Sequence, residues 1–157
     1  MNPMSETWQK NQSKIAEAVQ VLNEAELRTN IIDMMTKGVA ALQVGCHRLA
    51  ARSGWWTDKD GNRIDPNVPE VFATKIALIH SEVSEALEGG RKGKPDDHLP
   101  HRSSVEVEFA DALIRIFDTA GAMGLDLAGA VVEKLAYNQQ RADHRRENRD
   151  AEGGKKF

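Results

Sequence analysis

The chain has 157 residues, of which 40% are apolar and 29% charged, an ordinary mixture for a single globular domain. Its 21 Lys and Arg residues against 24 Asp and Glu residues leave a net charge of −3, which argues against a nucleic-acid-coating protein. No apolar run reaches the roughly 18 residues of a membrane helix, so we expect no membrane partner. The first residues show no basic region followed by an apolar stretch, so we expect no secretory signal. The single cysteine, Cys46, excludes an internal disulfide framework, and we expect a cytoplasmic protein.

Proline positions and apolar spacing predict an all-α fold. The five prolines leave residues 4–65 and 101–157 free of proline, and these stretches carry helical periodicity. Two helices are expected within residues 5–53, separated near residues 23–30, followed by a polar loop over residues 57–69. The apolar stripe of the second helix predicts a face turned to the core, and its members are Ile31, Met34, Met35, Val39, Leu42, Cys46 and Leu49.

Three further helices are expected in the rest of the chain. The first runs over about residues 69–87, with Pro69 in its first turn and Gly89-Gly90 as its stop. Ser103 and Glu106 fit a capping box for a helix ending near residue 120, and Asp126 can cap a last helix through about residue 141. The expected buried stripes are Ile76, Ile79, Val83, Ala86 and Leu87 on the first, and Val105, Phe109, Ala112, Leu113, Ile116 and Phe117 on the second.

Two pairs of carboxylates stand beside these stripes. Glu82 and Glu85 lie three residues apart on one helix, and Glu108 and Asp111 lie three apart on the next. Residues at that spacing share a helix face, and a short connection makes the two helices antiparallel neighbours. Carboxylates at the edge of a buried stripe are costly unless they are paired or bind a cation. The arrangement favours a hard divalent cation, Mg²⁺ when the bound partner is a phosphate.

A simpler interpretation of the carboxylates stays open. Pairs of acidic residues at this spacing are common on solvated helix faces, where they pair with Lys or Arg. A similar alternative applies to the row formed by Lys134, Asn138 and Arg141, which suits a polyphosphate and its sugar. Taken alone, this row is better explained by a solvated face on which Lys134 pairs with a neighbouring Glu. The Trp55-Trp56 pair can supply a ring for base stacking, for which we take Trp56, although indoles are more often part of a core.

The order and spacing of these motifs resemble the MazG-like, all-α nucleoside triphosphate pyrophosphohydrolases, which include the dimeric dUTPases. The family motif is EExxE on one helix and ExxD on the next. Here Ser81-Glu82-Val83-Ser84-Glu85 is followed, after 22 residues, by Glu108-Phe109-Ala110-Asp111. A later K-x-x-x-N-x-x-R is matched by Lys134, Asn138 and Arg141, and the closing Gly-Lys-Lys-Phe is also similar. The resemblance covers about residues 40–157.

The resemblance implies a four-helix core with an extra N-terminal helix, assembled as a homodimer or homotetramer. It divides the chain into an N-terminal helical extension (residues 1–35), a helical domain (36–141) and a polar tail (142–157). The implied reaction hydrolyses a nucleoside or deoxynucleoside triphosphate to the monophosphate and pyrophosphate, in nucleotide-pool sanitation or phage nucleotide metabolism.

The resemblance also implies a role for each candidate residue. Glu82, Glu85, Glu108 and Asp111 are the expected ligands of Mg²⁺, for which Mn²⁺ can substitute. Lys134, Asn138 and Arg141 are the expected nucleotide contacts, and Glu82 or Glu85 is the expected activator of the attacking water. Ser81 departs from the family, which usually has its first glutamate at this position.

Other helical metal proteins fit the sequence less well. A ferritin-like di-iron bundle needs Glu-x-x-His pairs, and none of the candidate glutamates has a histidine three residues later. An HD-type phosphohydrolase needs a His-Asp dipeptide, which the chain lacks. The alternative from another class is a non-catalytic helical module that senses nucleotides or binds a protein, and Ser81 favours it.

Overall fold

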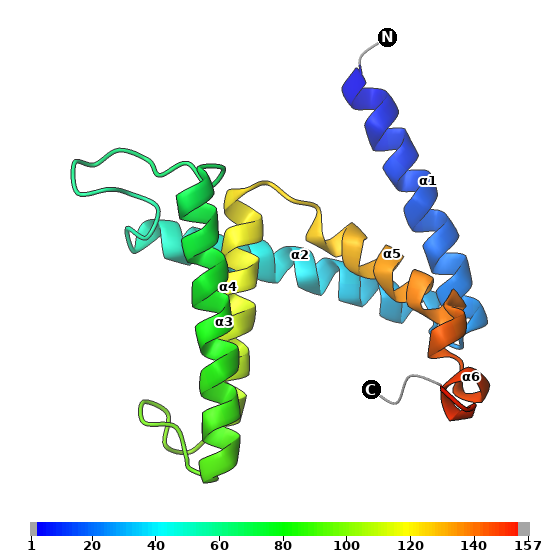
Figure 1. Cartoon of the computed structure of the whole chain (residues 1–157). Helices are drawn as coiled ribbons and strands as arrows, with labels where there is room; N and C mark the ends of the chain where they lie inside the picture. The colour runs from blue at the N-terminus through cyan, green and yellow to red at the C-terminus, as the bar shows by residue number, and fades with distance from the viewer. Residues whose placement is uncertain (1–2, 154–157) are drawn as a thin grey trace. The chain divides into compact units, whose positions relative to one another are not determined.

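The computed structural model describes residues 3–153 and consists of helices joined by loops (Figure 1). The helices are α1 (Pro3–Glu24), α2 (Thr29–Arg52), α3 (Pro69–Lys92), α4 (Ser104–Ala122), α5 (Leu127–Gln140), the 3-10 turn η1 (Ala142–His144) and α6 (Arg146–Asp150). Extended pairing within the described part is limited to two isolated bridges, Thr57 with Arg63 and Pro95 with Ser103. The expected all-α class and the break between the first two helices are therefore confirmed.

The described chain forms two compact units, and the boundary between them falls inside α2. The first unit contains α1, the beginning of α2, and the chain from Asp126 onward. The second unit, Ala41–Leu125, contains the end of α2 together with α3 and α4. None of the helices within residues 3–153 has the length and apolar character needed to cross a bilayer.

The first unit is held together by the packing of α1 against α5. Its core consists of Ala18, Leu22, Ile32, Val132 and Ala136. Asp126 caps α5 by accepting a hydrogen bond from the backbone N–H of Gly129, as the sequence predicts. A Cβ atom at Gly129 would lie 2.4 Å from that carboxylate and 3.1 Å from the Ile15 side chain of α1, so glycine permits both the cap and the close packing.

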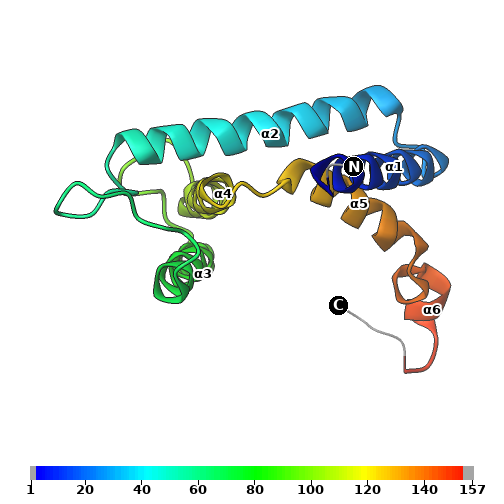
Figure 2. The same ribbon diagram turned by 90° about the horizontal axis from the view of Figure 1, so that it is seen from above.

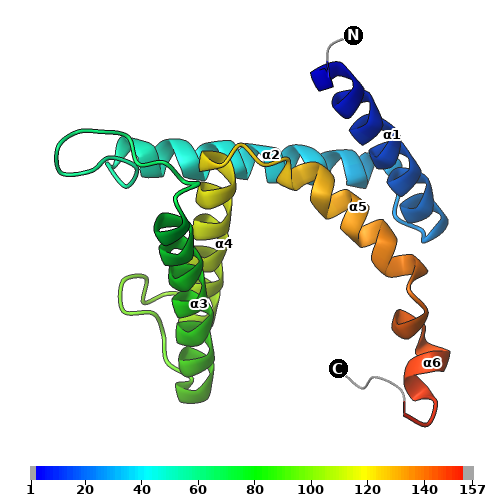
Figure 3. The same cartoon turned by 45° about the horizontal axis from the view of Figure 1, so that its top comes forward.

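The second unit is built on an antiparallel hairpin of α3 and α4, which lie side by side in all three views (Figures 1, 2 and 3). Pro69 begins α3 and Ser103 caps α4 by accepting from the Glu106 N–H, both as expected. The predicted stop at Gly89-Gly90 is wrong, because α3 continues to Lys92 and ends where Gly93 adopts a left-handed φ of 61°.

Gly89 has a packing role in the hairpin. A Cβ atom at this position would lie 2.4 Å from the Ser104 hydroxyl oxygen, so the missing side chain lets the two helices approach closely. Gly121 has a similar role where α4 meets α2, since a Cβ atom there would lie 2.6 Å from the Cβ of His47. Both glycines therefore serve the spacing between helices within the second unit.

The apolar stripes are less buried than the sequence predicts. Val83 and Leu87 of α3 are 50% and 66% exposed, and Phe109 and Leu113 of α4 are 55% and 51% exposed. Four members of the α2 stripe are exposed as well, namely Ile31, Met34, Leu42 and Leu49. Burial is confirmed for Ala86 and Ala112, which lie in the hairpin seam, and for Phe117. For the exposed members of the three stripes, the prediction of burial within the chain is wrong.

The C-terminal region contains more structure than a polar tail. The turn η1 and the short helix α6 occupy most of the stretch that follows α5. Arg141, expected as the end of the last helix, is instead its extended C-terminal cap. The Gly-Lys-Lys-Phe ending, residues 154–157, lies outside the described residues.

Candidate metal centre

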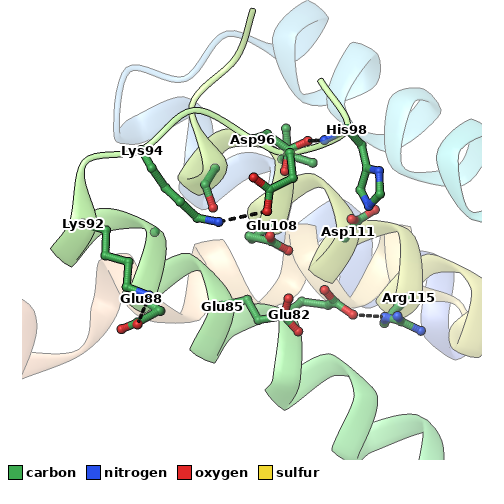
Figure 4. A pocket seen from close by; sticks show the side chains of 14 residues that line it. Glu82, Glu85, Glu88, Lys92, Lys94, Asp96, His98, Glu108, Asp111 and Arg115 are labelled. Atoms are coloured by element: carbon green, nitrogen blue, oxygen red, sulfur yellow. Dashed lines mark hydrogen bonds and ion pairs between the residues drawn. The ribbon is translucent and has the colours of Figure 1, made fainter. Parts of the chain in front are cut away.

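Three carboxylates converge between α3 and α4. Glu82 of α3 and the pair Glu108 and Asp111 of α4 each offer an oxygen atom, and these three atoms lie within 4.8 Å of one another. They converge because the acidic residues border the small-residue seam of the hairpin on both helices, so that antiparallel pairing turns them toward the same space (Figure 4). A group of this kind can hold a metal ion.

Glu82 is the buried member of this triad. Its Oε1 accepts a hydrogen bond from Nε of Arg115 at 2.5 Å, and the two side chains thereby form an ion pair. Arg115 stands one helical turn after Asp111 on α4. The buried charge of Glu82 is thus balanced by a guanidinium group at the side of the triad.

Burial and the repulsion between carboxylates raise the pKa values of the other two members, Glu108 and Asp111. Burial raises the pKa of Glu108, and the negative charges of Glu85, Glu82 and Asp111 raise it further. Burial also raises the pKa of Asp111, with the charge of Glu82 adding to the rise and that of Arg115 opposing it. Negative charge in excess of its local compensation, on oxygen donors alone, fits a hard cation that would neutralise it.

The fourth predicted ligand, Glu85, lies beside the triad but is not one of its three members. It lines the same cavity of about 390 Å³, and its charge contributes to the raised pKa of Glu108. Figure 4 shows Glu85 and Glu82 on the same side of α3. The structure therefore gathers three of the four predicted ligands and places the other in their cavity.

The end of α3 and the loop that follows it bring further polar groups to this cavity. Lys92, Lys94 and His98 line it, and His98 lies beside Asp111 in Figure 4. Asp96 is buried and organises the loop, because its Oδ1 accepts hydrogen bonds from the backbone N–H groups of His98 and Leu99. The cavity consequently combines carboxylates with cationic side chains at its rim.

A second cavity, of about 430 Å³, adjoins the first. The two cavities share Asp111 and Arg115 in their walls. The second is the more apolar, with Leu49, Trp55, Leu78 and Ile114 in its wall beside Cys46, Lys75 and Asp118. The pair of cavities suits a ligand that has an anionic part next to the carboxylates and a less polar part beyond Arg115.

Trp56, the predicted stacking residue, is buried and its ring is not accessible to a ligand at the surface. It is 4% exposed, and its indole N–H donates to Oδ1 of Asp118 at 2.6 Å. The ammonium group of Lys75 lies 4.0 Å from the centre of its ring, covering one face. Trp55 is 70% exposed and lines the second cavity, so its ring is the accessible one of the two.

Comparisons with known proteins add no further information on the site. No protein family, curated protein or solved structure matches this chain.

The predicted nucleotide contacts on α5 belong to the first unit. The Lys134 ammonium lies 4.5 Å from the centre of the Tyr137 ring, and Arg141 forms an ion pair with Asp143. Oδ1 of Asn138 is buried and has no hydrogen-bond partner among the described residues. Within this unit the amide oxygen of Asn138 is thus available for a further partner, while Arg141 already has one.

Sequence reasoning missed several residues of the site. Arg115 carried a signal, since it follows Asp111 by four residues and a helix places both on one face. Lys92, Lys94 and His98 could have been expected near the site, because they lie at or within the short connection between the two helices that carry the acidic residues. The contact of Asp118 with Trp56 and with His47 Nδ1, at 3.0 Å, spans more than sixty residues and has no comparable signal.

Proposed function

We propose that the chain is a Mg²⁺-dependent nucleoside triphosphate pyrophosphohydrolase. The observation that carries the proposal is the convergence of Glu82, Glu108 and Asp111 on one point from two helices. The motif spacing of the MazG-like enzymes supports it, and the lysines at the cavity rim suit a polyanionic ligand. Mn²⁺, which accepts the same oxygen donors, is the expected substitute.

The acidic triad would hold the metal ion. A divalent cation bound there supplies charge neutralisation and polarisation of the phosphate groups. Glu82 and Asp111, from facing helices, would hold it, and Glu108 would offer the third oxygen. The raised pKa values of Glu108 and Asp111 support a role of this kind, because a cation would offset both the burial and the repulsion that raise them.

The other side chains of the cavity would bind and orient the substrate. Lys92 and Lys94, which now pair with Glu88 and Asp97, would turn to the phosphates. The adjoining cavity would receive the nucleoside, with Trp55 as the accessible ring. Hydrolysis adds a water oxygen to the α-phosphorus and breaks its bond to the bridging oxygen, which leaves with pyrophosphate. Glu85 lines the cavity without being a member of the triad, so we assign to it the proton of that water, because Glu82 would be occupied by the cation.

The experiment that tests this function separates the two possible products. The protein is incubated with Mg²⁺ and a panel of ribo- and deoxyribonucleoside triphosphates, and pyrophosphate and phosphate are assayed separately. We expect pyrophosphate release that Glu108→Gln reduces at least a hundredfold, because the triad loses one charged ligand. Glu106→Gln is the matched control, since Glu106 lies on the same helix and is exposed in a pair with Arg102. Release of phosphate alone, or no turnover of any triphosphate, contradicts the proposal.

A non-catalytic nucleotide sensor or protein-interaction module is the alternative. Ser81 favours it, because this side chain stands where the family has a glutamate and its hydroxyl donates to the carbonyl of Leu78 instead of reaching the cavity. A sensor would bind a triphosphate with Mg²⁺ and leave it intact in the same assay. An interaction module would show no effect of nucleotide.

We further propose that a second copy of the chain covers the exposed apolar face of the hairpin, here called the hairpin face and defined by Val83, Leu87, Phe109 and Leu113. Each of these four uncharged side chains is at least half exposed in the single chain, and monomeric proteins rarely expose large apolar patches. A twofold assembly would place the same face of each copy against the other and bury these side chains among four helices.

A further inference from the structure

We propose that Arg115 is an exchangeable counter-ion of the metal centre. It neutralises Glu82 in competition with the divalent cation, and it turns to a phosphate group when the cation takes its place. The inference rests on the proposed function, which supplies the phosphate-bearing ligand. It assigns to Arg115 a role in binding that neither the motif nor the acidic triad contains.

The position of Arg115 supports two alternative partners. Its Nε atom is bonded to Oε1 of Glu82, a member of the triad. The side chain is nevertheless 41% exposed, whereas that of Glu82 is only 7% exposed, so the guanidinium can move while the carboxylate is confined. Arg115 also lines both cavities, which places it at their junction.

Charge explains why the two cations compete. A cation held by Glu82, Glu108 and Asp111 would share the carboxylate that Arg115 now engages. A metal ion and the guanidinium group of Arg115 would repel each other if both contacted Glu82. They would also compete for the lone pairs of this single buried carboxylate. Binding of the metal therefore weakens the Arg115–Glu82 bond.

The released guanidinium has a chemically suitable partner nearby. An anionic ligand in the acidic cavity brings phosphate oxygens to the metal and to the walls of that cavity, of which Arg115 is one. The planar guanidinium donates two parallel hydrogen bonds to a phosphate, a geometry that Lys92 and Lys94 do not offer. The exchange therefore ties the strength of phosphate binding to the presence of the metal.

The test measures metal binding and phosphate binding separately in the full chain. Binding of Mn²⁺ alone is followed by calorimetry, and binding of inorganic pyrophosphate is then measured at saturating Mn²⁺. For Arg115→Met we expect Mn²⁺ to bind about threefold to tenfold more tightly, because its competitor is gone. Pyrophosphate should bind about tenfold or more weakly, because a charge-assisted contact is lost. Arg115→Lys, which keeps the charge, should bind Mn²⁺ much as the wild type does and pyrophosphate with intermediate strength.

Opposite changes in the two affinities distinguish this role from a structural one. If Arg115 only maintains the packing of the hairpin, Arg115→Met weakens both ligands, and the inference is overturned. Unchanged Mn²⁺ binding overturns it as well. Arg102→Met is the control for loss of one positive charge, since Arg102 pairs with Glu106 outside the acidic cavity, and it should alter neither affinity. Failure of the wild type to bind Mn²⁺ instead refutes the proposed function itself.

Discussion

At the scale of single residues, the candidate centre depends on carboxylates held in an unfavourable setting. Glu108 and Asp111 have raised pKa values because burial and neighbouring negative charges disfavour their ionised forms. Asp58, Asp96 and Asp143 have lowered pKa values, because hydrogen bonds from backbone N–H groups or from Arg141 favour the ionised form. Glu108 and Asp111 are therefore set apart from Asp58, Asp96 and Asp143 by the direction of their pKa shifts.

These shifts predict an unusual pH dependence of stability. A carboxyl group whose folded pKa is raised stabilises the fold below its ordinary pKa, and this contribution disappears as the pH rises through the raised value. When a chelator keeps metal ions away, the free energy of unfolding of Glu108→Gln should therefore increase relative to that of the wild type as the pH rises from acidic to neutral. Thermal unfolding of both proteins across this range measures the difference, in which the titration of Asp58, Asp96 and Asp143 cancels.

At neutral pH, addition of Mg²⁺ should instead favour the stability of the wild type over that of Glu108→Gln. At a concentration one hundred times its Kd, a ligand that binds only the folded protein stabilises it by about 2.7 kcal/mol. The wild type should show this gain, Glu108→Gln should not, and the gain should shrink as protons compete for the triad at lower pH. A gain that is equal in the two proteins would show that the cation binds elsewhere.

At the scale of secondary-structure elements, the α3–α4 hairpin positions the centre through its close seam. Ala86, Gly89, Ser104 and Ala112 are buried along it, and this spacing brings Glu82 within reach of Glu108 and Asp111. Small residues at the seam thus determine how closely the two acidic edges approach. The loop that follows α3 then carries Lys94 and His98 over the same cavity.

Two adjacent glycines allow a matched test of this seam. Gly89→Ala should destabilise the protein by about 1–3 kcal/mol, because the new Cβ would meet the Ser104 side chain and overpack the contact. Gly90→Ala is the control, since its Cβ would lie 3.5 Å from Val105 in ordinary contact, and it should stabilise the helix by up to about 1 kcal/mol. Urea unfolding measures both; equal effects would show that the seam does not limit helix spacing.

Much of the secondary structure could be predicted because its signals are local. Pro69, Ser103 and Asp126 mark helix starts through contacts that span a few residues. The extension of α3 through Gly89 and Gly90 could not, since those glycines are retained for contacts with α4 that lie outside any local window. The convergence of the carboxylates follows from helical spacing and a short loop, whereas the partner of Glu82 depends on side-chain geometry that the spacing does not define.

At the scale of the whole molecule, the hairpin face is the feature for which the sequence pattern predicted burial within the chain and the structure shows exposure. Periodicity places Val83 with Leu87 on one face of α3 and Phe109 with Leu113 on one face of α4. The same pattern results whether these faces pack within one chain or against another. Their exposure in the single chain is the observation that separates the two cases. A partner copy is therefore the proposed complement of the hairpin.

A charged substitution in this face should weaken self-association. Leu87 is 66% exposed, so Leu87→Lys should change the stability of an isolated chain by no more than about 0.5 kcal/mol. Burial of the lysine against a second copy is unfavourable, and association should weaken at least tenfold, or about 1.4 kcal/mol. Sedimentation velocity over a concentration series measures this effect. Ala77→Lys, at another exposed position of α3, is the control, and a wild type that stays monomeric throughout would contradict the assembly.

The position of the unit boundary inside α2 restricts how the chain can be dissected. A fragment that starts at Ala41 would begin in the middle of a helix, where four backbone N–H groups lose their acceptors and no capping side chain replaces them. Such a cut would fray the segment that carries Cys46 and Leu49, two residues in the wall of the apolar cavity. A truncated protein for ligand studies should therefore retain α2 from Thr29, with a cap engineered ahead of it.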